Sequence, residues 1–308
     1  YGLPGSGYIL ENDGHGNFTI SKNNTLENIG MITDASWVDI NNDGWQDLII
    51  LGEWMPIKIY ININSKLVDE TDSYGLTNTS GLWSSMELVD VDGDGDKDIV
   101  AGNIGLNNFF EKNMRMYVFD FDGNGFKEQI ICRIRVDGYY PIVDKDELIS
   151  QIPSLKKKLL YYKDYAKSNM QSIFYEEVLN KAFFLDLNTL ESAIFFNENG
   201  IFVRQKLPNE IQYAPVYTIS STDLNKDGYI DLFFGGNQYL VKPQFGSYDA
   251  SKGWALFGPF SSKKEKAIVY PLDIKGQIRN LKWVNYNNKK ILIALINNDK
   301  TVFKVYIE

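Results

Sequence analysis

The sequence contains a single cysteine, Cys132, and a single histidine, His15. One cysteine cannot form a disulfide within the chain, and its place in the apolar run 130–134 favours a small buried strand residue over a thiol nucleophile. His15 lies in the Asn- and Gly-rich segment 12–17, which is typical of a hairpin turn. A Ser-His-Asp or Cys-His catalytic arrangement, or a zinc site with several histidines, is therefore hard to assemble.

Long apolar runs and basic clusters are also scarce. The longest uncharged apolar stretches, near 48–51 and 291–296, are far shorter than the ~20 residues of a membrane-spanning helix. Lysine clusters such as 156–158 and 263–264 are short, so the sequence does not indicate nucleic-acid binding. The 308 residues, 44% of them apolar, favour a globular protein. Because the chain begins without Met or a signal peptide, we expect a segment of a longer protein.

Acidic residues are plentiful, and the segment 90–98 holds five carboxylates in nine residues. Such a cluster would repel itself in a compact fold unless a cation joined it, so the segment either binds metal or stays disordered. Short apolar runs of strand type flank it on both sides, which favours a loop anchored in a sheet. Carboxylates at alternate positions, with Gly95 for the sharp bend, are typical of the first part of a calcium loop.

The same pattern occurs four times, in loop 1 (39–47), loop 2 (90–98), loop 3 (120–128) and loop 4 (223–231). Each loop has Gly at position 6, an acidic residue at position 9 and an apolar strand after it. Position 12 is Ile50, Ala101, Ile131 or Phe234, whereas an EF-hand needs Glu there. Acidic turns merely rich in Asp and Gly are the alternative to metal binding.

We predict three to four structural Ca²⁺ sites, with the side chains at positions 1, 3, 5 and 9 and the carbonyl at position 7 as ligands. The predicted ligands are Asp39, Asn41, Asp43, Trp45 and Asp47 in loop 1; Asp90, Asp92, Asp94, Asp96 and Asp98 in loop 2; Asp120, Asp122, Asn124, Phe126 and Glu128 in loop 3; and Asp223, Asn225, Asp227, Tyr229 and Asp231 in loop 4.

The order of elements around these loops repeats as strand, metal loop, strand, Gly turn and further strands. Asp90 follows Asp39 by 51 residues, and a period of 40–60 residues with four strands per repeat is typical of a β-propeller blade. We therefore predict an all-β fold, a propeller of four-stranded blades forming one domain over 1–308. Loop 3 follows too soon for a new blade and is expected between the outer strands of the second one. Capping and 3,4-spacing signals predict a helical insertion at about 144–181.

The loop pattern and its apolar exit strand resemble the FG-GAP/VCBS repeat, best known from integrin α-subunit propellers. The segments 52–56, 146–158 and 248–251 resemble the bacterial members associated with ASPIC/UnbV domains. This resemblance implies a calcium-stabilised, non-enzymatic binding or scaffold module at the cell surface or outside the cell, and more blades before residue 1. Loop 3 departs from the repeat at Asn124 and Glu128, and the last strands have no metal loop.

A ligand surface, for a glycan or a protein, is expected at the turns after the exit strands, because in propellers these turns converge near one end of the central channel. The candidate ligand residues are Glu53, Trp54, Asn103, Asn107, Asn237, Gln238 and Tyr239. The alternative is that Trp54 covers the core and the Asn residues merely form turns. The rival function is a carbohydrate-active lyase or hydrolase, since carboxylates alone can act as acid and base.

Overall fold

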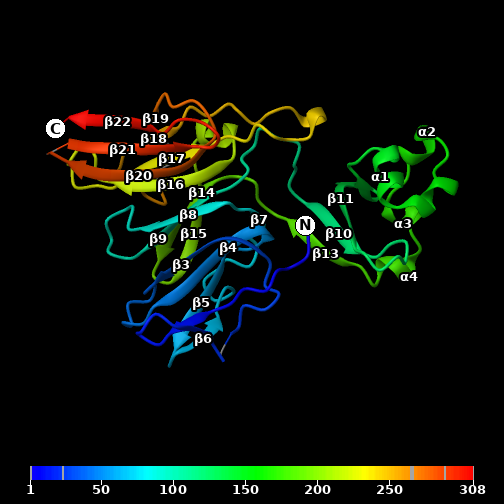
Figure 1. Cartoon of the computed structure of the whole chain (residues 1–308), viewed down its shortest axis with the longest axis horizontal. Coiled ribbons are helices and arrows are strands. Elements are labelled where there is room, and N and C mark those ends of the chain that lie inside the picture. Colours follow the sequence, from blue (N-terminus) through cyan, green and yellow to red (C-terminus); the bar gives the residue numbers. More distant parts are fainter. Residues whose placement is uncertain (1, 23, 264–266, 288, 308) are drawn as a thin grey trace.

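The computed structural model describes residues 2–22, 24–263, 267–287 and 289–307, and it consists mainly of antiparallel sheets (Figure 1). A short hairpin of β1 (Leu10–Asn12) and β2 (Phe18–Ile20) precedes them. No helix in the described part of the chain is long and apolar enough to cross a membrane.

The first sheet contains β3 (Met31–Val38), β4 (Asp47–Met55), β5 (Lys58–Ile63) and β6 (Lys66–Asp69), in that order. Two further residues, β7 (Gly81–Leu82), pair with the end of β4. Alternate residues of β4 face opposite sides: Ile49 and Leu51 pack toward the second sheet, while Leu48 and Ile50 pack toward the N-terminal segment. Both faces of this strand are buried, which explains why its sequence is apolar without alternation.

The second sheet is assembled from two distant parts of the chain. Its strands are β8 (Ser85–Val89), β9 (Asp98–Gly102), β14 (Ala193–Glu198) and β15 (Ile201–Lys206), and β9 pairs directly with β14. Loop 3 does not lie between these strands, so the expectation that it belongs to this sheet is wrong. The pairing partner of β9 comes about 90 residues later, a distance that local spacing does not reveal.

The third sheet contains β16 (Val216–Thr222), β17 (Asp231–Gly236), β18 (Trp254–Leu256) and β19 (Val269–Pro271). The fourth contains β20 (Ile278–Tyr286), β21 (Lys289–Ile296) and β22 (Val302–Ile307). Apolar cores join the second sheet to the third and the third to the fourth. Short 3₁₀ segments at Asn209–Tyr213 and Pro243–Phe245 lie in the connections.

The excursion between β9 and β14 forms its own sheet, with loop 3 between its first two strands. The order is β12 (Gly138–Pro141), β11 (Glu128–Arg135), β10 (Met114–Phe119) and β13 (Phe183–Leu187). Between β12 and β13 the chain forms α1 (Lys145–Gln151), a 3₁₀ segment (Pro153–Lys157), α2 (Tyr162–Tyr165), α3 (Met170–Ile173) and α4 (Glu176–Leu179). The Asp144 side chain caps α1 by accepting from the Glu147 N–H at 2.8 Å. The helices therefore occupy the range in which the sequence predicts them.

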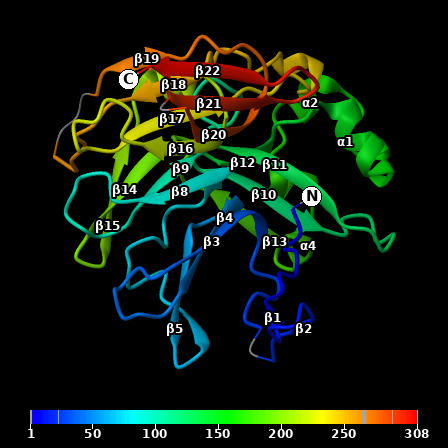
Figure 2. The same cartoon turned by 60° about the vertical axis from the view of Figure 1, so that its left-hand side comes forward.

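The four main sheets lie in a row, with the helical excursion to one side (Figures 1 and 2). Their first strands β3, β8, β16 and β20 are neighbours in that order. Side chains connect these strands: the Asp34 carboxylate accepts from the Met86 N–H at 2.9 Å, and the Thr218 hydroxyl accepts from the Leu281 N–H at 3.1 Å. The row aligns the loops at the strand ends, which places the candidate sites.

Candidate metal centres and a pocket at the opposite strand ends

All four acidic loops have the same closed shape, held by the carboxylate at position 1. This group accepts a hydrogen bond from the N–H of the glycine at position 6, at 2.8 Å in loop 1, 3.0 Å in loop 2, 2.8 Å in loop 3 and 3.1 Å in loop 4. The glycines have φ between 88° and 101°, a region that favours glycine. The regular spacing of Asp and Gly in the sequence therefore specifies one loop geometry four times.

The acidic residue at position 9 is the first residue of the exit strand and is buried in every loop. One of its oxygens accepts from the N–H at position 2, at distances of 2.7–3.0 Å across the four loops. In three loops the other oxygen accepts from the main chain of a neighbouring segment: Asn62 for Asp47, Asn197 for Asp98 and Gly258 for Asp231. Position 9 thus fixes the loop to its sheet.

Carboxylates gather most closely in loops 2 and 3. Oxygens of Asp90, Asp92 and Asp98 lie within 4.8 Å of one another, as do oxygens of Asp120, Asp122 and Glu128. Loops 1 and 4 have Asn at position 3, and among the described residues no such group of three carboxylates occurs there. The structure therefore brings together positions 1, 3 and 9 of the predicted ligand set in two loops.

The electrostatics of loop 2 favour a bound cation. Burial raises the pKa of Asp98 to about 7, and the charges of Asp92 and Asp94 add to this effect. Burial and the charge of Asp94 likewise raise the pKa of Asp92. A cation at this point would oppose each of these causes, because it stabilises the ionised carboxylates.

Two orphaned oxygens provide a further test of the fit. Oδ1 of Asp92 in loop 2 and Oδ1 of Asp223 in loop 4 are shielded from solvent and have no hydrogen-bond partner among the described residues. A buried carboxylate oxygen without a partner is costly, and a metal ion would satisfy it. With oxygen donors only, the loops suit a hard cation such as Ca²⁺. Asp90, Asp92 and Asp98 would hold it in loop 2, and Asp120, Asp122 and Glu128 in loop 3.

Positions 5 and 7 are exposed in loops 1, 3 and 4, and in loop 2 position 5 is exposed while Asp96 at position 7 is half-buried. The side chain at position 5 accepts from the N–H at position 7, at 2.9 Å in loops 1, 2 and 4 and 2.8 Å in loop 3. The aromatic side chains at position 7, Trp45, Phe126 and Tyr229, are 50%, 78% and 43% exposed. The side chains at position 7 differ in chemistry, since loop 2 has Asp96 there, in keeping with a role for the backbone carbonyl at this position.

A polar and aromatic pocket lies at the opposite ends of the same strands. We call this cavity of about 330 Å³ the turn pocket; its principal lining residues are Glu53, Ser84, Phe109, Tyr217, Gln238 and Tyr248. Glu53 is near the end of β4, whereas Asp47 of loop 1 begins that strand, so the two are ~20 Å apart along it. The pocket and the metal loops are therefore separate sites.

The candidate ligand residues divide into three groups. Glu53 and Gln238 line the turn pocket. Three others are buried, namely Trp54, Asn103 and Asn237. The side-chain oxygen of Asn103 accepts hydrogen bonds from the N–H groups of Leu82 and Ile104.

The buried Asn237 side chain donates to the Ser251 carbonyl and accepts from the Ser251 N–H. The two remaining candidates do not line the pocket: Asn107 is exposed and donates to the Tyr213 carbonyl at 3.1 Å, and Tyr239 is 42% exposed. Sequence reasoning missed Tyr217 and Tyr248, because Tyr217 is the second residue of β16 and Tyr248 lies in an irregular segment, whereas the candidates were sought in the turns after the exit strands.

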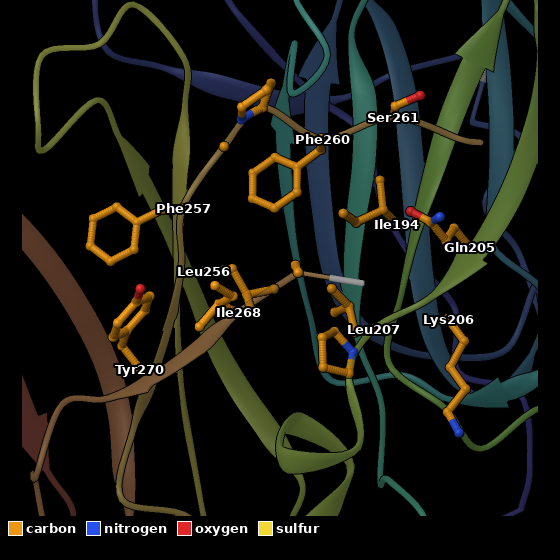
Figure 3. Close-up of a pocket in the computed structure, with 14 residues that line it drawn as sticks. Ile194, Gln205, Lys206, Leu207, Leu256, Phe257, Phe260, Ser261, Ile268 and Tyr270 are labelled. Atoms are coloured by element: carbon orange, nitrogen blue, oxygen red, sulfur yellow. The ribbon is translucent and has the colours of Figure 1, made fainter. Parts of the chain in front are cut away.

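Another cavity, of about 410 Å³, lies between the second and third sheets (Figure 3). Figure 3 shows Phe257, Phe260 and Tyr270 around it, with Lys206 at one side. Its lining contains no carboxylate, histidine or cysteine among the described residues. The cavity therefore combines apolar surface with the polar groups of Gln205, Lys206 and Ser261.

Residues 39–101, which include loops 1 and 2, match the FG-GAP-like repeat family. A comparison of the chain with curated proteins finds no match. The match supports the repeat family for these two loops and their sheets, and is consistent with a propeller-like binding or scaffold module.

Proposed function

We propose that the chain is a calcium-stabilised β-propeller module, outside the cell or at its surface, that binds a glycan or a protein without catalysing a reaction. The observation that carries this proposal is the shared geometry of the four loops, each built into the start of a buried exit strand. The carboxylates gathered in loops 2 and 3 and the orphaned Asp92 oxygen support bound cations. The FG-GAP-like match supports the module type.

A structural rather than catalytic role for the metal is supported by its position. The loops are separated from the turn pocket by the length of a strand, and their ligands also fix each loop to its sheet through position 9. A chain with several such ions would rely on a calcium-rich environment, which favours the outside of a cell. The bacterial ASPIC/UnbV-associated type remains part of this proposal.

The rival enzyme function has less support. Glycoside hydrolysis ordinarily uses two carboxylates flanking the scissile bond. Among the described residues that line the turn pocket, Glu53 is the one carboxylate, and the nearby Glu147 pairs with Lys242. A single carboxylate without a partner acid suits ligand recognition better than acid–base catalysis.

Thermal melting in calcium and in chelator tests the proposal. Each site adds about 2.7 kcal/mol at a hundredfold excess of free Ca²⁺ over the dissociation constant, so chelation should lower the melting temperature clearly. Asp43→Ala and Asp227→Ala should lower the melting temperature in calcium, while Asp164→Ala, an exposed carboxylate outside the loops, should not. An unchanged melting temperature of protein shown to be metal-free by elemental analysis would falsify calcium stabilisation.

A further inference from the structure

The turn pocket contains a carboxylate with no internal partner. Glu53 is half-buried, and its side chain has no hydrogen bond or ion pair among the described residues. The half-buried Glu87 carboxylate, in contrast, accepts from the Ser221 hydroxyl at 2.5 Å. The two oxygens of Glu53 are therefore acceptors available to a ligand.

The same pocket contains hydrogen-bond donors without acceptors. The proton of the Tyr248 hydroxyl has no acceptor within the described structure, although the residue is only 4% exposed. Burial raises the pKa of Tyr248, an effect that the Phe109 backbone N–H opposes, so the phenol keeps its proton at neutral pH. The Gln238 Oε1 accepts from Tyr217 at 2.7 Å, which orients its amide and leaves the Nε2 group without a partner in the described structure.

Aromatic rings form another part of the lining, beside aliphatic side chains and Lys242. Phe109 is stacked between Phe110 and Phe245, with ring centroids 4.1 Å and 3.9 Å away. Tyr217 is held from the other direction by the Arg279 guanidinium, 4.2 Å from its ring centroid. These contacts fix the rings before any ligand arrives, which lowers the entropic cost of binding.

The pattern of free groups limits the ligand chemistry. An ammonium or guanidinium ion could pair with Glu53, but it has no acceptor for the Tyr248 and Gln238 donors. An anion could satisfy those donors, but Glu53 would repel it, and Lys242 in the lining is already paired with Glu147. A neutral compound with several hydroxyl groups satisfies both sides, because each hydroxyl donates one hydrogen bond and accepts two.

We propose that the turn pocket binds one neutral sugar residue of a glycan. Glu53 accepts hydrogen bonds from sugar hydroxyls, and Gln238 and Tyr248 donate to others. The apolar C–H face of the sugar ring packs against the Tyr217 ring, because both faces of Phe109 are covered by Phe110 and Phe245. The volume, about 330 Å³, is at the small end of ligand pockets, which suits a terminal residue better than a long internal stretch. This inference rests on the proposed binding function and names its ligand class.

The test measures binding of glucose, galactose, mannose, N-acetylglucosamine, cellobiose and lactose in calcium by saturation-transfer NMR and titration. We expect at least one of them to bind at millimolar concentration. Glu53→Gln should weaken this binding roughly 10- to 100-fold, because a hydrogen bond to a charged group is lost. Glu177→Gln, an exposed carboxylate on α4, serves as the matched control and should bind as the native chain does.

Tyr248→Phe separates recognition from structural support. It removes a buried hydroxyl whose proton has no acceptor, so the melting temperature should change little, while sugar affinity should fall by about tenfold. Tyr286→Phe, at an exposed tyrosine on β20, should change neither quantity. If Tyr248→Phe lowers the melting temperature and leaves the affinity intact, the hydroxyl has a structural role and the proposal is overturned.

Two further outcomes also overturn the inference. One is the absence of binding by every sugar in the panel to folded, calcium-loaded protein. The other is binding of methylguanidinium that depends on Glu53 when no sugar binds, which would identify a cation site. Both results leave the calcium proposal intact if chelation still lowers the melting temperature. Sugar binding without any effect of calcium would refute calcium stabilisation and leave this inference standing.

Discussion

Asp47 should stabilise the chain even when no metal is bound. Its carboxylate is fully buried and accepts from the Ile40 N–H at 3.0 Å and from the Asn62 N–H at 2.8 Å. Asp47→Ala would leave both amides without an acceptor in the interior, at a cost of about 1–3 kcal/mol each. The summed loss of about 2–6 kcal/mol is a large part of the 5–15 kcal/mol by which domains are typically stable.

Asp43 in the same loop provides the comparison. It is exposed and accepts mainly within its own turn, so Asp43→Ala should cost less than about 1 kcal/mol in chelator. In calcium both variants should lose stability, because both residues are predicted ligands. Melting or urea unfolding of the two variants in chelator and in calcium gives the four values needed. Equal losses for Asp47→Ala and Asp43→Ala in chelator would refute the reasoning.

Two other predictions concern residues outside the loops. Burial alone would raise the pKa of Glu191, but Lys112 at 2.9 Å and the charge of Arg204 hold this pKa at about 2. The resulting stability should be complete above about pH 4.5 and lost as the pH falls toward 2. Glu191→Gln should therefore flatten the dependence of the melting temperature on pH over that range, measured in chelator. Gly236→Ala would place a Cβ 1.7 Å from the Pro215 carbonyl oxygen, so the yield of folded protein should collapse, whereas Gly5→Ala, whose nearest contact is 3.8 Å, should express normally.

Local features of the sequence predicted the loops well because their geometry is local. Gly44 and Gly228 adopt the positive φ that their position requires, and Asp47 and Asp231 begin exit strands as expected. The runs 48–51 of β4 and 232–234 of β17 are apolar without alternation because both faces of these strands are buried.

Contacts between residues far apart in the sequence could not be predicted from local patterns. Nothing in the residues around loop 3 shows that β9 pairs with a strand beginning at Ala193. Burial of Trp54 depends on Phe110, 56 positions later, whose ring lies edge-on to it at 6.2 Å. The pocket likewise combines Glu53, Tyr217 and Tyr248 from three regions of the chain. Spacing rules concern neighbours in sequence, whereas these contacts depend on how the sheets are placed in the row.

The split assembly of the second sheet has a consequence for synthesis. β9 ends at Gly102 and its partner β14 begins at Ala193, so one edge of β9 stays unpaired while about 90 residues are added. At typical elongation rates this lasts roughly 5–20 s. Val100 and Ala101 are fully buried in the finished chain and belong to that open edge, which makes it a template for wrong pairing. A growing chain therefore carries an aggregation-prone edge until the excursion is complete, and a chaperone that covers 98–102 would act during this interval.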